Sequence, residues 1–221
     1  MAEIWFHRLA LLGTVLTLVI VMSGAWVRLT DAGLGCPDWP GCYGHLMPPA
    51  TEQAIAASNA AYPDSPVDSG KAWREMAHRY AIPLLGIIVL ALAGIAVAMH
   101  KDLLMPFWVP LLLVPLLGVQ ALLGMLTVTL QLKPIVVLAH LLGGMTTLAL
   151  LAWLALRTRP RAPRLIGAES RFRSAAMVAL LIVFLQIALG GWTSANYAAV
   201  ACPDFPTCQS QWWPDTDFAS A

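Results

Sequence analysis

Three ionisable side chains, Glu75, His78 and His140, fall at the edge of long apolar stretches or inside them. Ionisable residues at membrane depth are rare and often functional. Each histidine lies about one turn past the start of an apolar run, and both runs are expected to cross the membrane in the same direction. Two histidines at equal depth on facing helices commonly hold a haem, with one imidazole on each side of the iron.

The neighbouring residues suit the same site. Glu75 precedes His78 by three residues and shares its helical face. Gly143 and Gly144, one turn beyond His140, remove side chains where a flat macrocycle would approach. Two arginines, Arg28 and Arg79, are expected at the same outer level and could form charge-assisted hydrogen bonds with haem propionates. The alternative is that these imidazoles bond backbone carbonyls or lie in the headgroup layer.

Four cysteines form two closely spaced pairs, Cys36 with Cys42 and Cys202 with Cys208, each enclosing five residues. The spacing favours a local disulfide that staples a loop. A redox-active dithiol is the alternative. A zinc site is disfavoured because only two thiols converge in each loop.

The elements that must position these residues are apolar helices. The chain is 59% hydrophobic and 11% charged, with a mean hydropathy of +0.72, which is typical of a membrane protein. A net charge of +1 provides no basic field for nucleic acid. Five runs approach or exceed the roughly 20 residues that a spanning helix needs: 9–27, 76–99, 105–129, 135–156 and 174–194.

Charge is sorted between the connections. One side holds eight Lys and Arg against three carboxylates, whereas the other holds five against nine. The positive-inside rule therefore predicts a cytoplasmic N-terminus and periplasmic cysteine loops in a bacterial inner membrane. That compartment is oxidising, which agrees with paired cysteines.

Residues 24–49 and 190–215 align without gaps and match at nine of 26 positions, including both cysteines of each loop. Copies that run in the same direction imply a four-helix unit repeated in parallel. The expected architecture is all-α: a four-helix transmembrane bundle over 1–156 with an outer loop at 28–75, an Arg-rich linker at 157–173, and the first helix and loop of a second bundle over 174–221. We expect three further helices after Ala221.

Three motifs together resemble the haem A synthase family: GAWVRLTDAGLGCPDWPGC at 24–42, EMAHR at 75–79 and LAH at 138–140. The resemblance implies an eight-helix enzyme that oxidises a ring methyl of haem O to a formyl group. It further implies that His78 and His140 flank the iron of the substrate haem. Glu75 would then be the catalytic carboxylate, and Cys36 and Cys42 a functional or stabilising pair.

The resemblance also implies a haem b cofactor held by a second histidine pair. Carrying the repeat forward puts that pair near positions 244 and 306, beyond this chain. A haem O synthase and a second copy of the chain are candidate partners, together with membrane lipid, and the electron acceptor is not identified. A quinone-linked disulfide oxidoreductase and a b-type cytochrome electron carrier are the competing functions.

Overall fold

The protein is described by a computed structural model over residues 2–100, 106–159, 170–198, 201–204 and 206–212. Its six helices are α1 (Ala2–Leu29), α2 (Glu52–Ala61), α3 (Ser69–Ala98), α4 (Trp108–Thr129), α5 (Pro134–Arg157) and α6 (Ser170–Ala195). Among the described residues, five of these are long and apolar enough to cross a membrane, α2 being the exception. The predicted all-helical membrane fold with five spans is confirmed.

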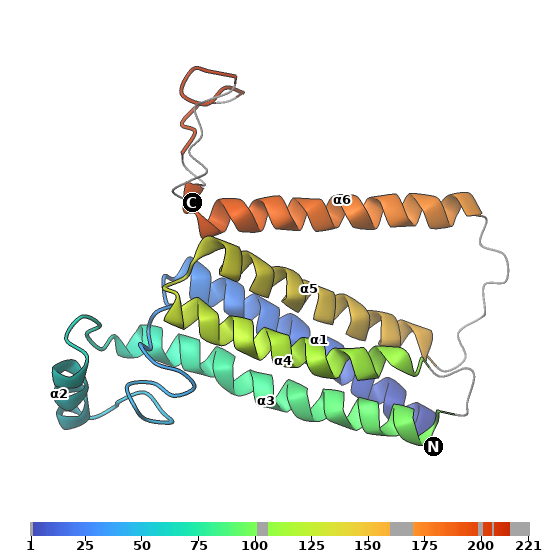
Figure 1. The fold of residues 1–221 in the computed structure, drawn as a ribbon, viewed down its shortest axis with the longest axis horizontal. Coiled ribbons are helices and arrows are strands. Elements are labelled where there is room, and N and C mark those ends of the chain that lie inside the picture. Colours follow the sequence, from blue (N-terminus) through green and yellow to red (C-terminus); the bar gives the residue numbers. More distant parts are fainter. Residues whose placement is uncertain (1, 101–105, 160–169, 199–200, 205, 213–221) are drawn as a thin grey trace.

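Four of the long helices form a bundle, with α6 alongside α5 (Figure 1). Contacts run around the bundle from α1 to α3, from α3 to α4, from α4 to α5 and from α5 back to α1. Within the described helices, no Cα atom of α3 lies within 8 Å of one from α5. The two helices that carry the histidines are therefore diagonal to each other across the bundle.

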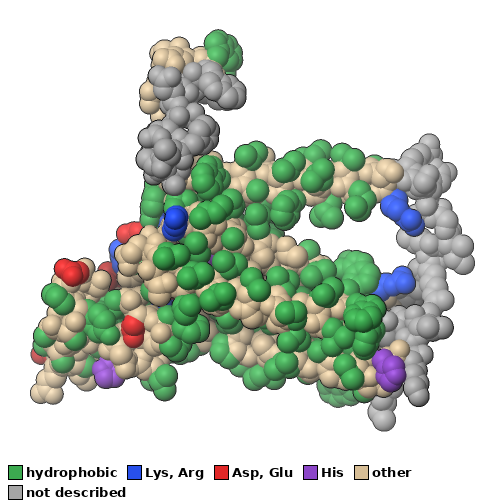
Figure 2. All heavy atoms as spheres, in the orientation of Figure 1, with side chains coloured by type: hydrophobic (Ala, Val, Ile, Leu, Met, Phe, Trp, Pro, Cys, Tyr) green, Lys and Arg blue, Asp and Glu red, His purple; other side chains and the backbone are tan. Residues whose placement is uncertain are grey.

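The bundle interior is filled by aliphatic side chains and one aromatic ring, while much of its flank exposes large apolar groups. Fully buried examples are Phe6, Leu92, Leu113, Leu151 and Leu154. In Figure 2 apolar side chains cover the sides of the helices, and charged ones gather toward the two ends. An apolar belt between charged ends is what a lipid bilayer requires of its protein surface.

The third helix begins earlier than its apolar run suggests, at Ser69 instead of near Met76. Asp68 is its N-cap, and its carboxylate accepts a 2.9 Å hydrogen bond from the backbone N–H of Lys71. That bond, the largest of several causes, lowers the pKa of Asp68. The early start carries Glu75 on the same regular helix as His78, so the backbone fixes their relative positions.

The outer connection between α1 and α3 contains the short helix α2, which the sequence reasoning did not predict. Thr51 caps α2 by accepting from the N–H of Ala54 at 3.2 Å. Both cysteine loops lie at the same end of the molecule (Figure 1). Most of the Arg-rich linker expected at 157–173 lies outside the described residues.

Candidate haem-ligand site

The outer loop after α1 is closed by a disulfide between Cys36 and Cys42, whose Cα atoms are 4.8 Å apart. Inside the loop, both oxygens of Asp38 accept backbone hydrogen bonds, from Tyr43 at 2.6 Å and from Gly44 at 2.8 Å. His45 and Cys42 exchange a pair of backbone bonds at 2.7 and 3.2 Å. Side-chain and backbone bonds within the loop thus fix its shape locally.

This loop packs against the outer turns of α3. A Cβ on Gly35 would lie 2.6 Å from the backbone carbon of Lys71, so only glycine permits such a close approach of the two chains. The backbone N–H of Cys36 donates to Glu75 Oε2 at 2.9 Å. Both cysteine side chains are fully buried. A thiol–disulfide exchange site needs accessible sulfur, so this burial argues against a redox role for the Cys36–Cys42 pair.

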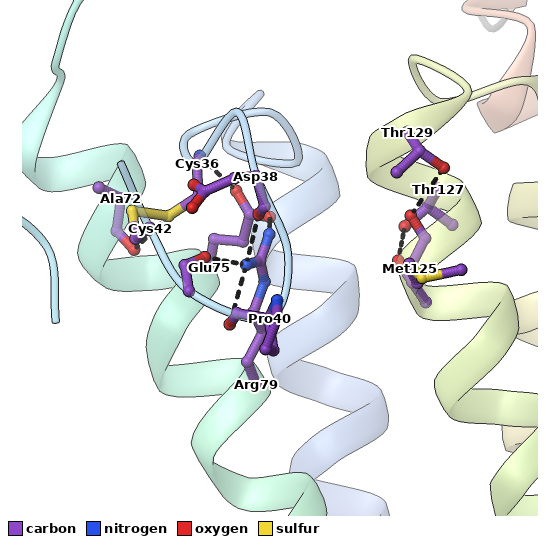
Figure 3. A network of polar contacts seen from close by, with 12 residues as sticks. Cys36, Asp38, Pro40, Cys42, Ala72, Glu75, Arg79, Met125, Thr127 and Thr129 are labelled. Atoms are coloured by element: carbon purple, nitrogen blue, oxygen red, sulfur yellow. Dashed lines mark hydrogen bonds and ion pairs between the residues drawn. A yellow bond between two sulfur atoms is a disulfide. The ribbon is translucent and has the colours of Figure 1, made fainter. Parts of the chain in front are cut away.

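Arg79 joins the loop to α3 (Figure 3). Its Nη2 forms an ion pair with Glu75, one turn earlier on the helix. Its Nη1 donates to the carbonyls of Asp38 at 2.9 Å and Gly41 at 2.5 Å. The guanidinium is therefore engaged with a carboxylate and the disulfide loop, whereas the sequence suggested a haem propionate as its partner. Both terminal nitrogens of Arg79 thus have protein acceptors, and its contact with a haem propionate stays a prediction.

Tyr43 completes the packing of the outer loop. Its ring lies edge-on to that of Tyr62, with centroids 5.5 Å apart, and its hydroxyl donates to the carbonyl of Pro66 at 3.3 Å. Burial, followed by the nearby charge of Glu75, raises the pKa of Tyr43. The phenol is therefore a fixed hydrogen-bond donor at neutral pH, holding the segment before α3 against the disulfide loop.

The two predicted ligands, His78 of α3 and His140 of α5, come from diagonal helices that both pack against α1 and α4. Each faces a glycine on a neighbouring helix. A Cβ on Gly24 of α1 would lie 3.1 Å from His78 Cε1, and one on Gly124 of α4 would lie 3.4 Å from His140 Cε1. Both imidazoles thus occupy space that a larger residue on the facing helix would take.

The glycines predicted to admit a macrocycle have a different neighbour. Gly143 faces the buried side chain of Gln120 from α4, which would overlap any Cβ at that position. A Cβ on Gly144 would lie 3.9 Å from the side-chain oxygen of Gln120. In this structure these two glycines therefore make room for a carboxamide beside His140. Their contact with a haem stays a prediction.

One polar atom at this site is buried without a partner. His140 Nδ1 makes no hydrogen bond within the described part of the chain, whereas His78 Nδ1 lies 2.8 Å from the hydroxyl of Ser23. A bundle with two inward imidazoles from diagonal helices, an unsatisfied ring nitrogen and glycines facing both rings fits a ligand with a metal centre, because neutral imidazole binds iron through a ring nitrogen. The residues present therefore fit a haem.

Arg28, the other predicted propionate partner, lies at the outer end of α1. Its Nη2 donates to the carbonyl of Ser194 at 2.6 Å, and its guanidinium lies 3.8 Å from the ring centroid of Tyr197. Its Nε is buried without a partner in the described part of the chain. Arg28 thus ties α1 to the C-terminal end of α6, where backbone carbonyls attract a cation.

The second cysteine loop repeats the internal bonds of the first. Cys202 and Cys208 form a disulfide with a Cα separation of 4.5 Å, and Asp204 accepts from the N–H groups of Gln209 at 2.7 Å and Ser210 at 2.9 Å. A hydrogen bond from the Thr207 side chain is the largest cause that lowers the pKa of Asp204. The aligned sequence frame therefore encodes one local loop structure twice.

Two hollows lie away from the histidines. One, of about 420 Å³, opens in the outer loop beside Tyr43, Asp68 and Lys71. The other, of about 440 Å³, is an apolar groove between α5 and α6, lined by residues such as Leu150 and Phe184. Neither histidine lines either hollow.

Ser23, Gly24 and Gln120 belong to the site although sequence reasoning did not select them for it. The Gly24 signal was present, because glycine recurs at the aligned position 190. Gln120 belongs to a Gln-x3-Gly-x2-Thr pattern that recurs at 186–193, but such residues are common at helix contacts in membranes and indicated packing. Ser23 carries no comparable signal. Their roles depend on which helices become neighbours.

The chain matches the profile of the COX15-CtaA family, described as cytochrome oxidase assembly protein, over residues 7–220. It is similar to the haem A synthase of Shewanella oneidensis, with 44% identity over 98% of this chain and 64% of that protein. It is also similar to the haem A synthases of Halalkalibacterium halodurans, with 28% identity over 94% of this chain, and of Caulobacter vibrioides, with 29% over 89%. The chain spans 64%, 67% and 62% of the lengths of these three relatives.

Proposed function

Because the chain belongs to the COX15-CtaA family of cytochrome oxidase assembly proteins, we propose that it forms the substrate-binding part of a haem A synthase. In this proposal haem O lies between His78 and His140, and a ring methyl is oxidised to a formyl group. The observation that carries the proposal is the pair of imidazoles on diagonal helices, with a buried carboxylate one turn from one of them.

The protein side of the reaction is binding, orientation and charge. An unactivated methyl group is beyond the reach of ordinary side chains, so the haem iron supplies the oxidising chemistry when bound. Glu75 holds its carboxylate in a buried position, fixed by Arg79 and by the N–H of Cys36. A fixed carboxylate of this kind stabilises positive charge that develops beside it.

The haem b cofactor requires a second pair of imidazoles. Of the other histidines, His7 and His100 lie near the N-terminus of α1 and the C-terminus of α3, whereas His45 lies in the outer loop. His100 lies beyond the last helical residue of α3 and His45 lies outside any helix, so neither is presented by a helix to a facing histidine. We propose that haem b is held by the part of the relatives that has no counterpart in this chain, and that a haem O synthase delivers the substrate.

For localisation we propose a bacterial inner membrane, with a cytoplasmic N-terminus and periplasmic cysteine loops. The support is the excess of Lys and Arg on one side and the two disulfides on the other. We propose a second copy of the chain as a further partner. The mass of the purified protein in detergent tests whether protomers associate.

The test is formation of haem A, in a membrane that supplies haem O, by protein that carries this chain together with the complete second repeat. We expect His78→Ala and His140→Ala to abolish haem A and to reduce bound haem. We expect Glu75→Gln to lower haem A while haem remains bound. His100→Ala is the matched control, because that side chain is exposed at the other end of α3. Unchanged haem content and product in both His78→Ala and His140→Ala would contradict the proposal.

A further inference from the structure

The two imidazoles are held differently. Ser23 of α1 places its hydroxyl oxygen 2.8 Å from His78 Nδ1 and also 2.8 Å from the carbonyl oxygen of Ile20, one turn back on its own helix. His140 Nδ1 is buried and makes no such bond within the described residues. The bond to Ser23 determines which nitrogen of the His78 ring carries the proton.

A serine hydroxyl carries one proton, and a carbonyl oxygen can only accept. Donation to Ile20 therefore commits the hydroxyl proton, as in the other back-bonded hydroxyls of this helix, Thr14 and Thr17. Toward His78 the Ser23 oxygen is then an acceptor, so Nδ1 must carry the hydrogen. In a neutral imidazole with Nδ1–H, the lone pair is on Nε2.

We propose that Ser23 is a positioning residue that fixes His78 as the Nδ1–H tautomer and so presents Nε2 as its metal-binding atom. This inference rests on the proposed function, because it concerns how the same ligand pair meets haem iron. A metal-bound histidine usually donates its other ring N–H to a fixed acceptor, which sets ring orientation and raises ligand basicity. His78 has that acceptor, so we expect it to be the more rigidly held ligand of the two.

The structure of the helix end alone does not explain the serine at position 23. At the aligned position of the second repeat stands Leu189, whereas Gly24 is kept as Gly190. The repeated sequence frame therefore does not by itself require a hydroxyl at this position. Thr17 offers a matched control, since its hydroxyl makes the same kind of bond to the Gly13 carbonyl in α1 and, among the described residues, no hydrogen bond to an imidazole.

The tautomer can be read without haem. The full chain, with ¹⁵N-labelled histidines, is studied by NMR in detergent at neutral pH, and the His78 signals are identified by their loss in His78→Gln. We expect a protonated Nδ1 and an unprotonated Nε2 in the wild type, in Ser23→Thr and in Thr17→Ala. Ser23→Ala should give a mixture of tautomers. A protonated Nε2 in the wild type, or identical signals in Ser23→Ala, would overturn the assignment.

The second measurement is titration of the same proteins with ferric haem b as the probe, followed by absorbance. Loss of an outer-shell partner typically weakens metal binding by about 10- to 100-fold. We expect Ser23→Ala to raise the apparent Kd about tenfold and Ser23→Thr to restore it, with Thr17→Ala unchanged. Equal affinity in Ser23→Ala and wild type would refute the positioning role. If His78→Ala binds as tightly as wild type, the proposed ligand pair fails, while the nitrogen signals still report whether Ser23 sets the tautomer.

Discussion

Arg79→Met should release the disulfide loop from α3. The substitution keeps a long apolar stem but removes the ion pair to Glu75 and the donors to the carbonyls of Asp38 and Gly41. The side chains of Arg79 and Glu75 are 11% and 6% exposed, so the pair is largely shielded from water. Removing one partner of a buried pair costs about 3–5 kcal/mol, and the residual exposure of the guanidinium favours the lower end.

A cost of about 3 kcal/mol corresponds to about a 100-fold increase in the population of the undocked loop. The Cys36–Cys42 sulfurs are buried when the loop is docked, so a soluble reductant reaches them through the undocked form. When reclosing is fast, the rate of reduction follows the population of that form. We therefore expect Arg79→Met to speed reduction of this disulfide about 100-fold.

The assay is thiol release in detergent, resolved by mass spectrometry of peptides that contain each cysteine pair. Cys202–Cys208 is an internal control, because Cys202 is already exposed. Arg74→Met is the matched variant: Arg74 lies on the same helix and bonds the carbonyl of Gly70 within it, at 3.0 Å. Equal acceleration of both disulfides would indicate general unfolding. A rate for Cys36–Cys42 within threefold of wild type would refute the reasoning.

Three further predictions concern the first helices. Gly24→Ala should push the facing imidazole and weaken binding of ferric haem b about tenfold, whereas Gly86→Ala, which has open space, should not; equal affinities in absorbance titrations would refute this. The folded-state pKa of Asp68 is lowered, so its stabilisation of α3 is full above its ordinary pKa and is lost as pH falls through the lowered value. The protection of the first-turn amides, measured relative to their intrinsic exchange rates, should therefore fall in acid, and Asp68→Asn should remove that dependence. Arg28→Leu removes the contact with Tyr197, so spin labels at the outer ends of α1 and α6 should report a broader distance distribution than in wild type.

Hydropathy predicted the five spans because each run is long enough to cross a bilayer without help from distant residues. It could not predict that α3 starts at Ser69, since Lys71, Arg74 and Glu75 lower the hydropathy of its first turns while leaving helix propensity intact. The capping carboxylate of Asp68 was the available signal for that start.

The histidine pair and Glu75 could be selected from the sequence because ionisable groups stand out in apolar surroundings. The partners of Arg79 could not, because they are backbone carbonyls about 40 residues away, which carry no sequence identity. Ser23 was missed for a related reason. Its hydroxyl reaches His78 only because α1 and α3 pack together, and that packing is tertiary structure that the local sequence does not encode.

The diagonal arrangement of α3 and α5 links folding to ligand supply. Within the described bundle, α3 and α5 each pack against α1 and α4 but not against each other. A group bound to both His78 and His140 would therefore connect α3 and α5 directly. By mass action, a free ligand concentration of 100 times the Kd stabilises the folded state by about 2.7 kcal/mol. If that group is haem, as proposed, a cell short of haem would hold this protein in its less stable, ligand-free form, and membrane proteases would then lower its abundance.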